Sequence, residues 1–334
     1  MSASETGSTV GAGDALFDRY TLPKVALAII LVASLVGAWV TTALSGGTGI
    51  TLAIARWAYF VALGVLTGGL VWKHAFVRPA DLGTGAADYC AAMYHRFDRI
   101  AALAILALLA GAPLVVGRYL AAFGRTPGTL AYGLLVLGLV TIVAANSRRR
   151  GDVTAQFRST AGVAALALAV AVVVATAVAE VSLRGFDPAA AAVRVLHLLA
   201  VAVWLGGAVW NIFVAVPTGQ ERATVPVVQA AGEQLERFRW AVRGIIPTLL
   251  LTGLFQAVDG LGTTLATYLG STVGLAVLAK LGFVGVLVVI FKLCPLWRAC
   301  SPIEGVCDLE EIGGGQSRPE GAIDDGPTEA SADD

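Results

Sequence analysis

The stretch that decides the fold is Arg194–Pro217, RVLHLLAVAVWLGGAVWNIFVAVP. An α-helix rises 1.5 Å per residue, so about 20 apolar residues cross the roughly 30 Å hydrocarbon core of a bilayer. The stretch is that long, and its only charged residue, Arg194, stands at its start. It therefore predicts a transmembrane helix.

The same pattern occurs earlier in the chain, at Arg56–Pro79, RWAYFVALGVLTGGLVWKHAFVRP. A constant offset of 138 residues aligns the two stretches, which predicts an internal repeat. In both copies a small residue stands four positions before a glycine pair, a spacing that lets helix backbones approach closely in lipid. The matched pairs are Arg56 with Arg194, Tyr59 with His197, Gly68-Gly69 with Gly206-Gly207, Trp72 with Trp210, and Pro79 with Pro217.

The composition is that of an integral membrane protein, with 57% hydrophobic and 14% charged residues. The predicted fold is an all-α bundle of eight transmembrane helices over residues 24–293, in which helices two to four resemble helices six to eight as a parallel repeat (units about 52–147 and 190–293). The spanning runs fall at 24–45, 52–76, 99–121, 128–147, 160–181, 190–215, 239–259 and 272–293.

The two ends of the chain are polar. Residues 1–23 lack the basic region of a secretory signal peptide, so the first apolar run is expected to be retained as a helix. Residues 294–334 form a cysteine-containing segment followed by an acidic tail. Residues 308–334 of that tail hold nine acids and one arginine, which predicts disorder.

Lysine and arginine collect on one side of the predicted bundle. The loops after helices two, four and six carry twelve basic residues, against five on the opposite side. Cytoplasmic loops are enriched in such residues, so both termini are expected in the cytoplasm. The stretch Arg222–Arg243 reads as an amphipathic connection at the inner surface. We therefore predict a multi-pass protein of the cell membrane, with the lipid bilayer as its main partner.

The motif of Arg194, His197, Trp204-Leu205-Gly206-Gly207 and Pro217 resembles the copper resistance protein D (CopD) family of polytopic membrane proteins. Lys280, within VLAKLGFVGVLVV, also resembles that family's last membrane segment. The resemblance covers roughly residues 50–293. It implies a permease that moves or handles copper ions, with copper as its cargo. A copper-binding protein on the outer face is a candidate partner.

No catalytic motif is recognisable. The sequence has no Walker phosphate loop, His-Glu-x-x-His zinc motif, serine triad or dinucleotide loop, so no enzyme activity is expected. Nothing predicts a nucleic-acid partner. The chemistry is then left to metal-capable side chains and to ionisable groups within the membrane.

A group of metal-capable side chains maps to the predicted inner side. Thiolates and thioethers are soft ligands that suit Cu(I), so this group predicts an inner copper acceptor. The alternative is that these are reduced structural cysteines, since Cys294, Cys300 and Cys307 lack the Cys-x-x-Cys step. The full group is Cys90, Met93, His95, Cys294, Cys300 and Cys307, with His74 nearby.

A second group defines a predicted path from the outer side. His197 is the expected outer copper ligand, with Tyr59 beside it, and the alternative is an ordinary interfacial histidine. Lys280 is expected to pair with Glu180 or Asp259, either as part of the path or as a structural ion pair. The path residues are Arg194, Trp204, Gly206, Gly207, Lys280, Glu180 and Asp259.

Two other function classes stay open. A membrane haem or electron-transfer subunit would need paired axial ligands, but His197 is predicted near the outer surface and His74 and His95 near the inner one. Haem is therefore not favoured. A non-catalytic scaffold or sensor has only the acidic tail in its support.

Overall fold

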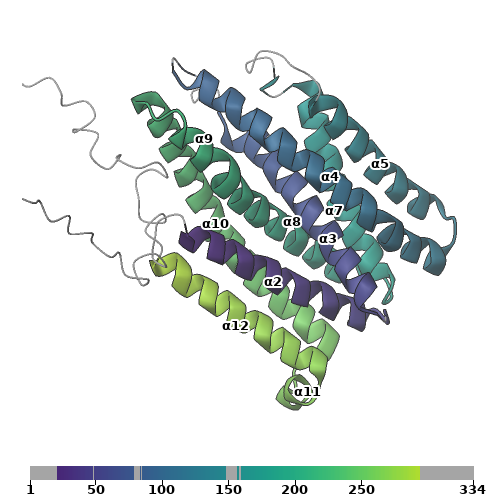
Figure 1. The fold of residues 1–334 in the computed structure, drawn as a ribbon. Coiled ribbons are helices and arrows are strands. Elements are labelled where there is room, and N and C mark those ends of the chain that lie inside the picture. Colours follow the sequence, from purple (N-terminus) through teal and green to yellow (C-terminus); the bar gives the residue numbers. More distant parts are fainter. Residues whose placement is uncertain are drawn as a thin grey trace, which may run out of the picture.

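The computed structural model describes residues 21–47, 49–78, 83, 85–147, 156–157 and 159–293. Every element in these ranges is helical, and eight helices are long and apolar enough to cross a membrane (Figure 1). The predicted all-α bundle of eight spanning helices is thereby confirmed. The first residues of α2 and the last of α12 lie at the same end of the bundle, as an even number of spans requires.

A short helix, α11 (Leu265–Gly270), lies between the last two spans, α10 and α12. Two of the spans contain a π-helical turn. In chain order the spans are α2 (Thr21–Leu44), α3 (Ile50–Val71) with η1 (Trp72–Phe76), α4 (Ala87–Phe123), α5 (Pro127–Ser147), α7 (Thr160–Ser182), α8 (Pro188–Trp210) with η3 (Asn211–Ala215) and α9 (Val216–Gln220), α10 (Val225–Leu261), and α12 (Thr272–Leu293).

Helices α4 and α10 are 37 residues each, much longer than the predicted runs 99–121 and 239–259. In α4 the added turns bury Tyr89, Cys90, Met93, Tyr94 and Phe97, which recur every three or four residues on one face. In α10 the stretch predicted as a surface connection is helical and continuous with the span. A search for wholly apolar runs misses such turns because only one face of them is apolar.

Local chemistry sets several helix ends. Asp187 caps α8 by accepting a hydrogen bond from the backbone N–H of Ala190 at 2.6 Å, and Pro188 follows at the first helical position. At their other ends, α4 and α10 stop at Gly124 and Gly262, which have φ of 69° and 77°. A side chain would be strained in that conformation, so glycine terminates both long helices.

Helices α3 and α8 form the centre of the bundle. Both pack against each other and against α2 and α7, while α4 covers α3 and α10 covers α8. At their crossing, a methyl group on Gly68 would lie 2.7 Å from the Cα of Gly206. The small residues thus let the two backbones touch, as the spacing predicts.

The 138-residue spacing of the aligned glycines also appears in the helix boundaries. The first residues of α3 and α8 are 138 apart, as are both the first and the last residues of α4 and α10. The last residues of α2 and α7 have the same separation. Matched residues of α3 and α8 also face each other, since the rings of Trp72 and Trp210 stack with centroids 5.9 Å apart.

The π-helical turn η1 begins at Trp72, and η3 begins directly after Trp210. A π-turn releases backbone carbonyls from the regular helical pattern and often marks a functional place. Here donors from neighbouring helices satisfy them: Arg237 donates to the carbonyl of Phe76 at 2.6 Å, and the Tyr89 hydroxyl donates to that of Ala215 at 3.3 Å. The long helices α4 and α10 therefore hold both irregular turns in place.

Candidate functional site

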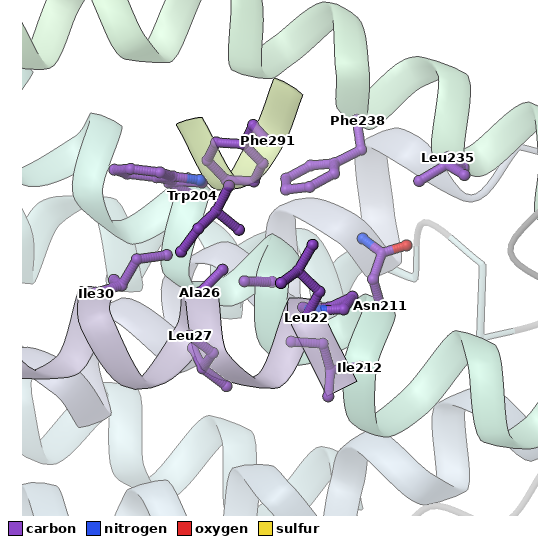
Figure 2. Close-up of a pocket in the computed structure, with 13 residues that line it drawn as sticks. Leu22, Ala26, Leu27, Ile30, Trp204, Asn211, Ile212, Leu235, Phe238 and Phe291 are labelled. Atoms are coloured by element: carbon purple, nitrogen blue, oxygen red, sulfur yellow. The ribbon is translucent and has the colours of Figure 1, made fainter. Parts of the chain in front are cut away.

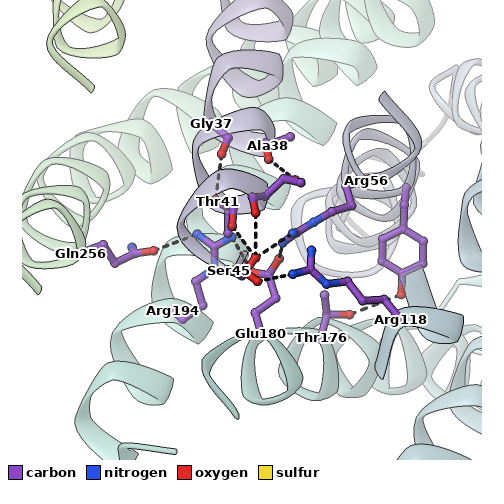
Figure 3. Close-up of polar contacts among 12 residues, drawn as sticks. Gly37, Ala38, Thr41, Ser45, Arg56, Arg118, Thr176, Glu180, Arg194 and Gln256 are labelled. Atoms are coloured by element: carbon purple, nitrogen blue, oxygen red, sulfur yellow. Dashed lines mark hydrogen bonds and ion pairs between the residues drawn. The ribbon is translucent and has the colours of Figure 1, made fainter. Parts of the chain in front are cut away.

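A buried carboxylate lies at one end of the α3–α8 contact. Glu180, near the end of α7, is 3% exposed and forms ion pairs with Arg56 of α3 and Arg194 of α8 (Figure 3). The Arg194 Nε donates to Oε2 at 2.7 Å, and Nη2 lies 2.5 Å from the same oxygen. The two arginines occupy matched positions of the aligned stretches, so one carboxylate serves both.

Further polar groups bind other donors of these arginines, although Arg56 Nε is buried without a hydrogen-bond partner. Arg194 Nη1 donates to the Gln256 side chain at 2.8 Å, and Arg56 Nη1 donates to the Ser45 hydroxyl at 3.3 Å. A third arginine, Arg118 of α4, donates to the backbone carbonyl of Ser45. A charge inside a bilayer is costly unless it is paired and hydrogen-bonded, which explains why the groups converge. Three guanidinium groups around one carboxylate leave an excess of positive charge.

A set of three hydroxyl groups adjoins the ion pairs on the α5 side. The hydroxyl of Tyr59 lies 2.8 Å from that of Tyr132, and Thr176 Oγ1 lies 2.9 Å from Tyr132 and 3.3 Å from Tyr59. All three side chains are buried. Thr176 is one helical turn before Glu180, and Tyr59 one turn after Arg56, so the hydroxyl set is stacked directly on the charged one.

His197 ends the network on the α10 side. Gln256 Nε2 donates to the backbone carbonyl of Thr252 at 3.0 Å, and the Thr252 hydroxyl lies 2.9 Å from Nδ1 of His197. That hydroxyl also donates to the carbonyl of Thr248 at 2.5 Å, which uses its one proton. It therefore accepts from His197, so the imidazole proton is on Nδ1 and the lone pair on Nε2.

The polar network thus runs through six helices, from Tyr132 on α5 to Thr252 on α10. We use this name below for Ser45, Arg56, Tyr59, Arg118, Tyr132, Thr176, Glu180, Arg194, His197, Thr252 and Gln256. Tyr59 and His197 lie on opposite flanks of Glu180, with bonds to different helices. The sequence analysis predicts Tyr59 beside His197, whereas the structure separates them by Glu180.

Lys280 approaches the network from α12. Its Nζ lies 3.0 Å from the place that a methyl group on Gly37 would occupy. The acids expected as its partners bind elsewhere: Glu180 binds the two arginines, and Asp259 lies 3.7 Å from Arg184. Within the described ranges, no acid lies within ion-pair distance of Lys280.

The remaining predicted path residues lie away from the charges. Gly206 makes the helix crossing, and a methyl group on Gly207 would lie 2.8 Å from the Trp72 indole nitrogen. Trp204 is buried beside Phe291 of α12, with ring centroids 6.0 Å apart. The two glycines thus serve close packing in the middle of the bundle.

In the described part of the chain, the predicted inner metal ligands do not lie together. Cys90 and Met93 are buried in the hydrophobic core of the bundle, whereas His95 is exposed on α4. Cys294, Cys300 and Cys307 lie outside the described residues. Across the part of the chain that the structure describes, no three His, Cys, Asp or Glu side chains come together in a way that could hold a metal ion.

The histidines are also far apart along the bundle. His74 packs against α7, with Nε2 2.7 Å from the place of a methyl group on Gly162. It lies fifteen residues beyond Tyr59, which aligns with His197, so His74 and His197 differ in depth by about 20 Å at 1.5 Å per residue. A pair of axial haem ligands from these two is geometrically out of reach.

Sequence reasoning singled out Glu180, Arg194 and His197 but missed their partners. It missed Arg56, Arg118, Gln256, Tyr132, Thr176 and Thr252. One signal was present, because two arginines at matched depths in facing helices require an anion between them. Glu180 is the one acidic side chain that is buried among the described residues.

Comparison with family models, curated proteins and solved structures gives no match.

Proposed function

We propose that the chain is a cell-membrane permease that moves or handles copper ions, with both termini in the cytoplasm and with a parallel internal repeat of helices two to four and six to eight. The resemblance of its motifs to the CopD family indicates copper as the transported ion. The equal 138-residue separations of the helix boundaries support the repeat. The proposed role is transport, without catalysis.

The observation that carries the proposal is the hydrogen bond between His197 and Thr252. Histidines that bind metals usually donate their second ring nitrogen to a protein acceptor, which fixes the tautomer and raises the basicity of the ligating nitrogen. The contact at 2.9 Å supplies such an acceptor, and Nε2 keeps its lone pair. His197 is then the first copper ligand, and the ion is bound where the network begins.

The ion pairs of Glu180 act as a closed gate in this proposal. The positive charge of Arg56, Arg118 and Arg194 raises an electrostatic barrier against protons and hard cations, as basic groups do in other selective pores. A copper ion held by a neutral imidazole keeps its positive charge and meets the same barrier, so its passage requires a change in the ion pairs of Glu180. Release of one arginine would free a Glu180 oxygen to compensate the charge of the passing ion.

On the inner side, the soft ligands form the proposed acceptor for copper. Cys90, Met93 and His95 belong to this group together with Cys294, Cys300 and Cys307. Cys90 and Met93 share one buried face of α4, one turn apart. Copper reaches Cys90 and Met93 only after a shift of the surrounding core, because both side chains are buried there.

The test measures copper binding to the purified protein and copper accumulation in cells at equal protein level. His197→Ala is compared with Leu196→Ala, which truncates the exposed neighbouring side chain on α8. His197→Ala should weaken copper binding and change accumulation, whereas Leu196→Ala should leave both unchanged. Binding should also weaken as pH falls, because a protonated ring has no lone pair to donate.

Equal copper binding and accumulation in wild type and His197→Ala would remove the support for a copper permease. An absorption spectrum of the same purified sample tests the haem alternative, since bound haem gives intense visible bands and bound Cu(I) gives none. Copper-independent behaviour without bound haem would instead favour a scaffold or sensor.

A further inference from the structure

A small apolar cavity lies at the opposite end of the bundle from the polar network. Its volume is about 60 Å³, and its walls come from the first turns of α2, the end of α8 with η3, the middle of α10 and the end of α12 (Figure 2). Figure 2 shows Trp204, Phe238 and Phe291 around it, with Ala26 and Leu22 of α2 facing them. The walls therefore join four spans within the membrane.

The chemistry of the walls excludes water as the occupant. A buried water makes two to four hydrogen bonds, and a cavity lined by apolar side chains stays dry. Apart from Trp204, Asn211 is the one lining residue with a polar side chain, and its amide nitrogen already donates to the carbonyl of Gly207 at 2.8 Å. A hydrocarbon group is the kind of occupant that these walls accept.

Two wall positions carry smaller side chains than their counterparts in the first half of the chain. At the 138-residue offset, Ala208 corresponds to Leu70, and Leu235 corresponds to Phe97. Leu70 and Phe97 are both buried in the core. Other wall residues are larger than their counterparts, since Trp204 corresponds to Leu66 and Phe238 to Ile100. Ala208 and Leu235 are therefore the positions at which a first-half side chain would fill the cavity.

The helices beside the cavity are also loosely joined. In the first half α5 packs against both α4 and α7, whereas α12 packs against α2 and makes no comparable contact with α10 in the described ranges. Of the residues of α12, Gly274 and Leu287 are the two that are buried. α10 and α12 therefore both border the cavity without packing closely on each other.

From these features we infer that the cavity holds the end of an acyl chain from a bilayer lipid. The volume is too small for a whole ligand, since a cavity of about 150 Å³ is needed for benzene. It accepts the last carbons of a chain whose remainder stays in the bilayer. The bound chain fills the space between α12, α8 and α10. This site is independent of copper handling.

The experiment uses quenching of tryptophan fluorescence by lipids with brominated acyl chains. The full-length protein is placed in nanodiscs of brominated or unbrominated phosphatidylcholine. Trp204 lines the cavity, so an inserted chain brings bromine against its ring. Comparison with Trp204→Phe isolates the Trp204 component from that of the other tryptophans, including the exposed Trp240.

Two variants fill the cavity with the side chains of the first half, Ala208→Leu and Leu235→Phe. Either one should abolish the Trp204 component of quenching, because the chain is excluded. The matched control Ala110→Leu adds the same side chain to an exposed position of α4 and should leave that component unchanged. Circular dichroism verifies that each variant keeps its helices, so if one fails to fold the other decides.

Two results would overturn the inference. One is quenching that does not differ between wild type and Trp204→Phe, since no chain then reaches the cavity. The other is a Trp204 component that persists in the folded Ala208→Leu and Leu235→Phe variants. In that case the bromine contacts Trp204 from outside the cavity.

Discussion

A methyl group added to Gly68 would lie 2.7 Å from the Cα of Gly206, so the two central helices meet without any side chain between them. Alanine normally favours a helix over glycine by about 1 kcal/mol. At Gly68 we expect the opposite sign, with Gly68→Ala destabilising the protein by about 1–3 kcal/mol through overpacking against backbone. Thermal denaturation in one detergent would measure the difference.

The matched control is Gly117→Ala in α4, where an added methyl group meets no atom within 4 Å. It should be neutral or slightly stabilising. If Gly68→Ala melts at the same temperature as Gly117→Ala, the helices do not touch at this crossing.

The second prediction concerns the carboxylate shared by the two arginines. Glu180→Gln leaves the buried Arg56 and Arg194 without a counter-charge, and loss of one partner of a buried ion pair costs about 3–5 kcal/mol. The comparison is Asp259→Asn, which breaks the half-exposed pair with Arg184 and should cost about 0–1 kcal/mol. Unfolding measurements that rank the two variants equally would contradict a structural role for the Glu180 pairs.

A pH prediction follows from the connection after α9. Arg96 Nη1 donates to Glu221 Oε1 at 2.9 Å, and this hydrogen bond lowers the pKa of Glu221. The folded-state pKa is then below the unfolded value of about 4.3, so the pair stabilises the protein above about pH 4. The stabilisation is lost as pH falls through the lower folded pKa.

Glu221→Gln should accordingly lose less thermal stability than wild type when the pH is lowered from 7 to 3. The effect should shrink in high salt, because Glu221 is fully exposed and its charge is screened. Parallel pH profiles of the two proteins at low salt would show that this pair has no influence on folding.

The last prediction is the orientation. The excess of basic residues after helices two, four and six predicts that both termini are cytoplasmic. A phosphatase fused after Asp334, which is active only outside the cytoplasm, should stay inactive, while a fluorescent protein at the same place should fluoresce. An active phosphatase would reverse the assignment of the two membrane faces, and with it the direction of the proposed copper path.

The spans could be predicted because lipid imposes a length and an apolar composition on each of them. The runs at 128–147 and 160–181 agree with α5 and α7 to within one residue at each end. The start of α4 could not be found in this way. Its first turns are stabilised by one buried face that includes Tyr89 and Met93, and the identity of the covering helices is a property of the tertiary fold.

The residues of the candidate site are also only partly predictable from the sequence. Glu180 and Arg194 stand out because charge is rare in apolar segments, and His197 because it is one of three histidines. Thr176 and Thr252 carry no such mark, since threonine is common in membrane helices and usually bonds to its own backbone. Their roles depend on which helix faces which, and that order is set by packing.

The length of helices α4 and α10 determines how far the molecule extends beyond the membrane. Each has 37 residues and is about 55 Å long, against a bilayer of about 40–45 Å with its headgroups. Their final turns end at the short stops Gly124 and Gly262, level with the other spans. The surplus length must then emerge at the opposite face, where the first turns of the two helices raise Arg96 and Glu233 into the aqueous phase. The described part of the protein is therefore lopsided along the membrane normal, with one face nearly flush with the lipid and the other standing above it.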